Sequence, residues 1–341
     1  MPRTPRPALL AAITGDGKLL ATGYVGGELR IWNAAARTRS FTLSGQVGTI
    51  TALAFSRDAE LMASGSDDGG LRLWYLEGSL DPDGAAETSA PARREGIITA
   101  PTPFNPPLPL DGHKRRVHTV AFSNDGLRLL SAADDGTARV WRTDAREDPL
   151  VLGRAGPPLE GAAIHGDGRL VVTVPSRGDP QVWTLPEGVG APLRRRGRAP
   201  IEAALFADDA AALLLIAASG AAEHWRREDS GWTFVAAHEP PERLAPIVEV
   251  IAPLSTEARR GRLWSALGHV LPPPRIDGFA RIHHDVIWTD ERRIELWTEH
   301  GERPRGLVGE TPLTNVAFND TGDRVVTIGA DATVRVWTVA R

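Results

Sequence analysis

The sequence contains no cysteine, which excludes disulfide bonds, thiolate catalysis and metal sites built on cysteine. Lysine is almost as scarce: Lys18 and Lys114 are the only two, so arginine supplies nearly all of the 39 basic residues. This bias, together with heavy use of alanine, proline and glycine, is typical of a GC-rich bacterial genome. We therefore expect a bacterial source.

The sequence also has no large excess of charge of one sign and no long hydrophobic run. The net charge is −4 and the pI is about 6.2, which does not favour a general binder of nucleic acid or acidic membranes. No run approaches the roughly 20 apolar residues of a membrane span. The apolar patch before Thr14 is shorter than the core of a signal peptide. We expect a cytoplasmic protein with no membrane contact.

Seven tryptophans recur at a nearly constant distance, and each closes a short apolar stretch. Their spacings are 42, 67, 42, 42, 72 and 40 residues, so four lie near 40 and two equal that period plus an insertion. The seven are Trp32, Trp74, Trp141, Trp183, Trp225, Trp297 and Trp337. Such a period is typical of repeat proteins, in which each unit buries its surface against its neighbours.

The segments that end at these tryptophans align with one another. ITALAFSRDAELMASGSDDGGLRLW ends at Trp74, and HTVAFSNDGLRLLSAADDGTARVW ends at Trp141. Each predicts a strand, a turn rich in Asp and Gly, a second strand, another such turn and a third strand. The strands are apolar nearly throughout rather than alternating, which is typical of strands buried on both faces.

These units resemble WD40 repeats, and the resemblance extends from Ala8 to Arg341. It is strongest in the units ending at Trp74, Trp141 and Trp337. The resemblance implies an all-β fold, a WD40-type β-propeller with four-stranded antiparallel blades around a channel. We predict one domain, residues 1–341, with seven blades. The alternative is eight blades, if Trp264 closes a blade of its own.

In this family a histidine, a hydroxyl, an aspartate and the tryptophan of one blade form a structural hydrogen-bonded set. The resemblance assigns these roles to His113, Ser131, Asp135 and Trp141. Asp68 and Asp331 hold the place of Asp135 before Trp74 and Trp337. Other units depart from the pattern: Gln46 and Glu310 replace the histidine, and Gly26, Arg177 and Ser219 replace the aspartate. The repeats are therefore expected to be degenerate.

Two insertions are expected, about residues 77–110 in the second blade and about 269–290 in the sixth. In the sixth blade, IVEVIAPLS, GRLWSALGH and RIELW are the expected strands. The first insertion is rich in proline, alanine and acid, so it is predicted to be an extended loop without its own core. It is either an ornament or a docking arm for a partner, with Arg93, Arg94 and Phe104 as candidate contacts.

Two further features bear on partners. The sequence places no outer strand after Trp337, so the last blade either closes on the segment before Ala8 or accepts a strand from a partner. The densest basic run comprises Arg194, Arg195, Arg196 and Arg198. It is either a solvated edge that discourages strand pairing or a patch for an acidic partner protein. RNA is a weaker possibility, because no aromatic residues interleave with the arginines.

No catalytic, metal or cofactor motif is present. His283, His284 and Asp285 are adjacent, but neighbours on a strand point to opposite faces. The sequence therefore favours a non-enzymatic module that binds another protein as a scaffold, adaptor, sensor or regulatory subunit. Similar bacterial proteins accompany kinases, STAND NTPases or caspase-like peptidases, and the resemblance implies such a signalling or defence complex. The alternatives are an RNA-binding propeller using Arg194 to Arg198 or, less favoured, a propeller hydrolase.

Overall fold

The fold was analysed in a computed structural model. The structure describes residues 8–34, 40–76, 107–153, 156–195, 199–206, 210–217, 222–229, 231–238, 284–290, 293–298, 305–308, 311, 313–319 and 324–338. In these residues all regular structure is β-strand, as the sequence predicts. No helix in this part of the chain is long and apolar enough to span a bilayer.

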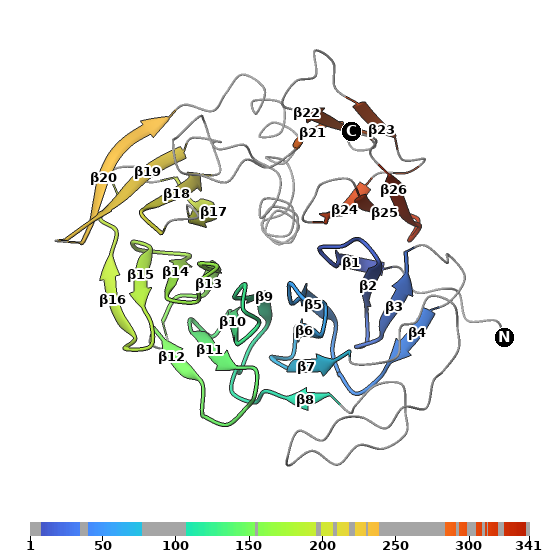
Figure 1. The fold of residues 1–341 in the computed structure, drawn as a ribbon, viewed down its shortest axis with the longest axis horizontal. Coiled ribbons are helices and arrows are strands. Elements are labelled where there is room, and N and C mark those ends of the chain that lie inside the picture. The colour runs from blue at the N-terminus through green and yellow to red at the C-terminus, as the bar shows by residue number, and fades with distance from the viewer. Residues whose placement is uncertain are drawn as a thin grey trace.

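The described strands form seven antiparallel sheets arranged in a ring, with the first strand of each sheet innermost (Figure 1). The first two sheets contain β1 (Ala8–Ile13), β2 (Leu19–Tyr24), β3 (Leu29–Asn33) and β4 (Ser40–Leu43), then β5 (Ile50–Phe55), β6 (Leu61–Ser66), β7 (Leu71–Tyr75) and β8 (Leu108–Pro109). The next two contain β9 (Val117–Phe122), β10 (Arg128–Ala133), β11 (Ala138–Arg142) and β12 (Leu150–Leu152), then β13 (Leu159–Ile164), β14 (Leu170–Pro175), β15 (Gln181–Thr184) and β16 (Val189–Pro192).

The fifth sheet has four strands, and the last two sheets have three each within the described residues. They contain β17 (Ile201–Phe206), β18 (Ala212–Ala217), β19 (Ala222–Glu228) and β20 (Gly231–His238); β21 (His284–Asp290), β22 (Arg293–Thr298) and β23 (Arg305–Val308); and β24 (Leu313–Phe318), β25 (Arg324–Gly329) and β26 (Val334–Thr338). The ring of blades is a β-propeller, so the predicted fold class is confirmed. Trp264 lies outside the described residues, and the choice between seven and eight blades stays a prediction.

Both expected insertions need a correction at their C-terminal ends. Leu108–Pro109, inside the range 77–110, forms β8 and pairs with β7, so it is the outer strand of the second blade. His284–Asp290, inside the range 269–290, forms β21 and pairs with β22. The segment GRLWSALGH was expected beside RIELW, but β21 occupies that place. The sequence does not distinguish the two, because GRLWSALGH and DVIWTD are both short apolar stretches before RIELW and periodicity does not say which of them pairs with it.

Neighbouring blades pack face to face through their first and second strands. β2, β14 and β18 are buried at nearly every position, as their continuous apolar sequences predict. Each described hydrophobic cluster draws side chains from two adjacent blades. For example, Ile50 of the second blade packs with Ala21 and Ile31 of the first. The core is therefore a series of interfaces between blades rather than one central mass.

The first and last blades close the ring through their inner strands. Ala8, Ala11 and Leu20 share a cluster with Val326 and Ile328. The amide of Ala11 donates to Asn315 Oδ1 at 3.2 Å, and both groups are buried. These contacts join residues about 300 positions apart in the sequence, so the ring closes by packing of inner strands.

Two glycines in second strands let the next blade approach closely. A Cβ on Gly65 would lie 2.7 Å from Val117 Cγ1, and one on Gly23 would lie 2.6 Å from Ile50 Cγ2. Both distances are shorter than any normal carbon contact. At these two places glycine therefore sets the spacing between blades.

We predict that Gly65→Ala destabilises the protein by about 1–3 kcal/mol, because the added methyl group overpacks the interface with Val117. Urea unfolding followed by tryptophan fluorescence measures the change. In a Val117→Ala background the same substitution should cost less, because the contact with Cγ1 at 2.7 Å is gone while the Cβ of residue 117 remains at 2.9 Å. An equal cost in both backgrounds would contradict this packing account.

Candidate functional site

The predicted set in the third blade is a continuous hydrogen-bonded chain. The indole Nε1–H of Trp141 donates to Ser131 Oγ at 2.8 Å, and Ser131 Oγ lies 2.8 Å from His113 Nε2. On the other side of the imidazole, His113 Nδ1 lies 3.0 Å from Asp135 Oδ2. The structure thus brings together all four residues, which come from β10, the turn between β10 and β11, β11 itself and the loop before β9.

The turn between β10 and β11 holds Asp135 in place with further donors. The amide of Thr137 and its hydroxyl donate to Asp135 Oδ1 at 3.0 and 2.7 Å, and the amide of Lys114 donates to Oδ2 at 3.1 Å. Partial burial raises the pKa of Asp135, but the hydrogen bonds from Thr137 and His113 outweigh it and lower the pKa to about 2. Asp135 is therefore a carboxylate with its acceptor sites occupied.

The directions of these bonds define the state of His113. Ser131 accepts from Trp141 and can donate its own proton only to His113 Nε2, so Nε2 must be the unprotonated nitrogen and Nδ1–H donates to Asp135. Burial lowers the pKa of His113, and the neighbouring carboxylate of Asp135 only partly opposes this. The neutral imidazole is the form that satisfies every group in the chain.

The connection Ser131–His113–Asp135 is the connection found in a serine hydrolase triad. Its surroundings differ from those of a nucleophile. Ser131 is completely buried, the His113 side chain has no exposed area, and Ser131 Oγ already accepts from an indole. A nucleophile needs room for a substrate carbonyl about 3 Å from the attacking oxygen. This arrangement has no such room, so it stabilises the blade.

Other blades retain the hydrogen bond from the indole to a hydroxyl but differ in the other members of the set. Trp32, Trp183 and Trp337 each donate at 2.9 Å to a threonine ten residues earlier, and Trp74 donates to Ser64 at 2.8 Å. In the second blade Gln46 replaces the histidine and hydrogen bonds to Ser64. The hydroxyl ten residues before the tryptophan is therefore the more widely retained part of the set.

Asp68 and Asp331 do not extend these chains as Asp135 does. Asp68 Oδ1 accepts from Ser66 Oγ and from the amide of Gly70. Asp331 Oδ1 accepts from the amide and hydroxyl of Thr333 at 3.1 and 2.7 Å, and these bonds lower its pKa. Both carboxylates thus organise their own turn, the ordinary role of Asp in such a position.

The fifth blade breaks the pattern in a way that the sequence analysis missed. Leu215 stands ten residues before Trp225, and within the described residues the buried Nε1–H of Trp225 has no hydrogen-bond partner. The spacing of ten residues was the available signal. The edge of the Phe234 ring lies against Trp225, with centroids 5.6 Å apart, and both pack in the apolar cluster of this blade. Apolar contacts here replace the hydrogen bond.

The turns between first and second strands contain a second repeated arrangement. In three of them a hydroxyl, that of Thr14, Ser56 or Ser123, donates to the aspartate two residues later. In the fourth blade His165 replaces the hydroxyl, and its Nδ1 lies 2.8 Å from Asp167 Oδ1. These carboxylates therefore serve their turns, as the sequence suggested. In the described residues no group of three or more His, Cys, Asp or Glu could hold a metal ion.

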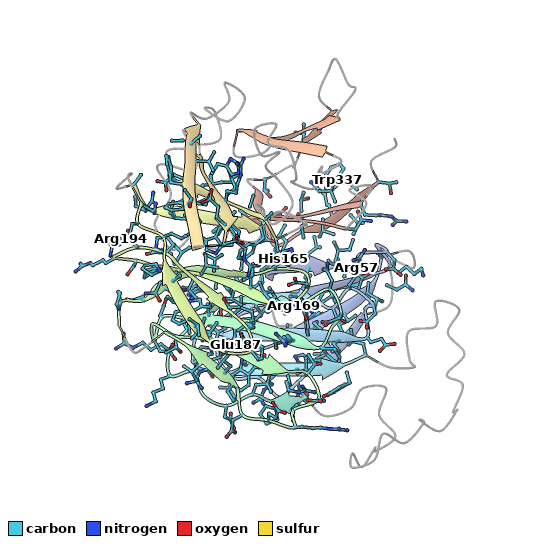
Figure 2. All side chains as sticks on the ribbon, turned by 60° about the vertical axis from the view of Figure 1, so that its left-hand side comes forward. Arg57, His165, Arg169, Glu187, Arg194 and Trp337 are labelled. Atoms are coloured by element: carbon cyan, nitrogen blue, oxygen red, sulfur yellow. The ribbon has the colours of Figure 1, made fainter. Side chains whose placement is uncertain are left out.

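The two described arginines of the basic run have different surroundings in the structure. Arg194 is exposed and projects outward from the fourth blade (Figure 2). Arg195 is instead buried: its Nη2 lies 3.0 Å from Glu223 Oε1 on β19, and its Nη1 donates to the carbonyl of Ala199 at 2.9 Å. The expectation that Arg195 contacts a partner is therefore wrong, because the next blade neutralises it. No local signal in the sequence shows this pairing.

The remaining candidates lie outside the described residues. They are Arg93, Arg94 and Phe104 of the first insertion, and Arg196 and Arg198 of the basic run. Their proposed role as partner contacts stays a prediction. The same holds for strand addition at the last blade, because residues 1–7 and 339–341 are not described.

Three segments of the chain match the family model for the WD domain, G-beta repeat: residues 37–75, 105–142 and 302–338. They end beside Trp74, Trp141 and Trp337, the units for which the sequence predicted the strongest resemblance, so that prediction is confirmed. These three segments are similar to WD40 repeats, and the ring of antiparallel sheets is the β-propeller fold that the resemblance implied.

The chain is also similar to parts of longer eukaryotic proteins. It is 25% identical over 201 residues to Periodic tryptophan protein 2 of Arabidopsis thaliana, covering 51% of this chain and 21% of the relative. It is 27% identical over 140 residues to Pre-rRNA-processing protein crb3/ipi3 of Schizosaccharomyces pombe, covering 40% and 29%. Protein hir1 of the same yeast is 26% identical over 140 residues, covering 37% and 14%. The chain thus spans less than a third of each relative, and their plant and fungal origin gives no support to the expected bacterial source.

We predict that Ser131→Ala destabilises the protein by about 1–3 kcal/mol, because it leaves the buried Trp141 and His113 nitrogens without their shared partner. Ser131→Thr should cost much less, because threonine accepts the indole bond in three other blades. Denaturant unfolding of the two variants tests this. Equal losses for alanine and threonine would mean that volume, not the hydrogen bond, controls the site.

The lowered pKa of His113 predicts a pH dependence of stability. The folded protein disfavours protonation, so stability is fully present above the ordinary value of 6.5 and is lost as the pH falls through the lower folded pKa. Melting temperatures measured from pH 7.5 down to pH 5 report this loss. His113→Gln imitates Gln46 of the second blade and should remove this part of the pH dependence. A variant with the same dependence as the wild type would show that His113 is not its source.

Proposed function

We propose that this protein is a non-enzymatic module that binds another protein and holds it on a rigid propeller. The observation that carries this proposal is the burial of the Ser131–His113–Asp135 chain. It is the arrangement in the described residues that most resembles a catalytic one, and it is closed to substrate. A protein whose buried polar groups hydrogen-bond within its own blades is rigid. A rigid propeller can present a fixed surface to a partner.

The lowered pKa values of three aspartates also favour a non-enzymatic function. Catalytic groups are held ready for proton transfer, with a pKa displaced toward the working pH. Asp135, Asp167 and Asp331 are displaced in the opposite direction, because hydrogen bonds in their turns stabilise the charged form. The propeller hydrolase alternative therefore receives no support from these groups.

The partner is proposed to be a protein in a larger complex. The relatives are matched over only a fraction of their length, and one of them, crb3/ipi3, is named as a pre-rRNA-processing protein. A bacterial signalling or defence complex, a cytoplasmic location and strand addition at the last blade remain proposals that rest on the sequence. The insertion with Arg93, Arg94 and Phe104 remains the proposed docking arm.

An RNA-binding function is the second candidate, because the relative crb3/ipi3 is named as a pre-rRNA-processing protein. The burial of Arg195 against Glu223 weakens it, because one cation of the run is already neutralised. Arg194 is the described cation of this run that faces solvent. Salt-dependent RNA binding that is lost in Arg194→Ala would favour this candidate.

We predict that affinity purification from the source organism recovers a stoichiometric partner protein that binds directly when both are purified. The full chain is compared with a variant in which residues 81–106 are replaced by a Gly/Ser linker of equal length. This variant retains Pro107 to Leu110, which β8 requires. Loss of the partner in the variant would identify the insertion as the docking arm, and retention would point to the propeller body.

If the partner is retained, Arg194→Ala tests whether it binds the propeller body at this exposed charge, because the change leaves the ion pair of Arg195 with Glu223 intact. No direct protein partner for either chain, together with turnover of a substrate in the purified protein, would overturn the proposal.

A further inference from the structure

One end of the first three blades carries a continuous surface of loops and turns. The first two strands of each blade are antiparallel, so the loop that enters the first strand lies beside the turn that leaves the second. A Cβ on Gly27 of the first blade would lie 3.1 Å from the amide nitrogen of Val47 in the second. A Cβ on Gly69 of the second would lie 3.1 Å from the amide nitrogen of Arg115 in the third. We call this surface the strip, residues 25–28, 44–49, 67–70 and 110–116.

The strip carries three pairs of exposed side chains in a fixed order. They are two valines, then two aspartates, then two cations: Val25 and Val47, Asp67 and Asp68, and Lys114 and Arg115. Val47 is 72% exposed, more than any other large hydrophobic residue in the described part of the chain. The surface therefore changes from apolar to acidic, and then to basic where the second blade meets the third.

Neutral donors hold the two aspartates in place. The amide of Thr49 donates to Asp67 Oδ1 at 2.7 Å. The hydroxyl of Ser66 and the amide of Gly70 donate to Asp68 Oδ1. Among the described residues, no cation forms an ion pair with either aspartate. The carboxylates therefore have fixed positions, and their negative charge faces solvent.

The two cations of the strip are fixed through their backbone. The amide of Lys114 donates to Asp135 Oδ2 at 3.1 Å, and the backbone of Arg115 packs on Gly69. Neither side chain forms an ion pair with a residue that the structure describes. The acidic turn and the basic loop thus touch without neutralising each other. Their charges are available to a partner whose own charges are arranged in the opposite sense.

We propose that the strip binds an extended segment of a partner protein that carries an apolar residue, then basic residues, then acidic residues. Charge complementarity with the strip sets this order. Packed sheets lie about 10 Å apart and an extended chain advances about 3.3 Å per residue, so one blade corresponds to about three residues of the segment. RNA does not fit, because its phosphates would meet Asp67 and Asp68. The inference rests on the proposed function and specifies the kind of partner.

Fluorescence anisotropy of a labelled peptide mixed with the full chain tests the inference. The probe is the peptide Leu-Gly-Ser-Arg-Arg-Ser-Glu-Glu, and the control is the same peptide with Arg and Glu exchanged. Both have the same composition and net charge, so only the order of the charges differs. The probe should bind about tenfold more tightly than the control, and the difference should shrink as salt is added. Equal affinities for the two peptides would overturn the inference.

A substitution that removes one charge provides the second arm. Asp68→Asn retains the side-chain oxygen that accepts from Ser66 and Gly70, and it should weaken binding of the probe peptide several-fold. The matched control is Asp125→Asn, because Asp125 also accepts from a hydroxyl and an amide, in a turn at the opposite end of the third blade. This control should bind like the wild type. Equal losses in the two variants would contradict a role for the strip.

The recovered partner protein separates this inference from the proposed function. A direct partner that binds Asp68→Asn as tightly as the wild type would overturn the strip as its binding surface and leave the proposed function standing. A partner that loses affinity in Asp68→Asn but not in Asp125→Asn would support both.

Discussion

The packing of one blade on the next is the interaction on which the rest of this structure depends. Second strands such as β2 and β18 are buried on both faces, and each hydrophobic cluster takes side chains from two blades. No blade can bury its faces alone, so stability accumulates around the ring. The close approach at Gly23 and Gly65 and the contact of Ala11 with Asn315 belong to the same interlocking.

Hydrogen bonds within each blade add to the stability that this packing provides. The hydrogen-bonded set from Trp141 to Asp135 is complete in the third blade. In the fifth blade a buried indole packs against an aromatic ring in place of that set. Apolar stacking tolerates this variation because it needs no exact partner, whereas a buried imidazole or hydroxyl does. The same difference explains why a triad-like connection can persist at a site as buried as that of Ser131 and His113.

The outer rim carries part of the surface that is open to partners. Outer strands also pack on the next blade, as Leu43 of β4 and Leu152 of β12 do, but they include residues exposed to solvent, such as Val151 and Val189. There the chain varies most, from two residues in β8 to eight in β20. Surface that does not hold the ring together is free to carry recognition. The exposed Arg194 lies in this outer zone.

The sequence alone determined the repeat, the strand order in most blades and the residues of the third-blade chain. The repeat rests on local spacing, a tryptophan every 40 or so residues, and the resemblance to WD40 repeats implied the residues of the third-blade set. The tertiary structure decided what depends on residues distant in the chain. Arg195 meets Glu223 because β19 of the next blade lies beside it, and β21 and β8 took places that had been assigned to insertions. Local spacing specifies a blade, whereas the neighbour of an arginine or of a strand edge is set only when the blades assemble into the ring.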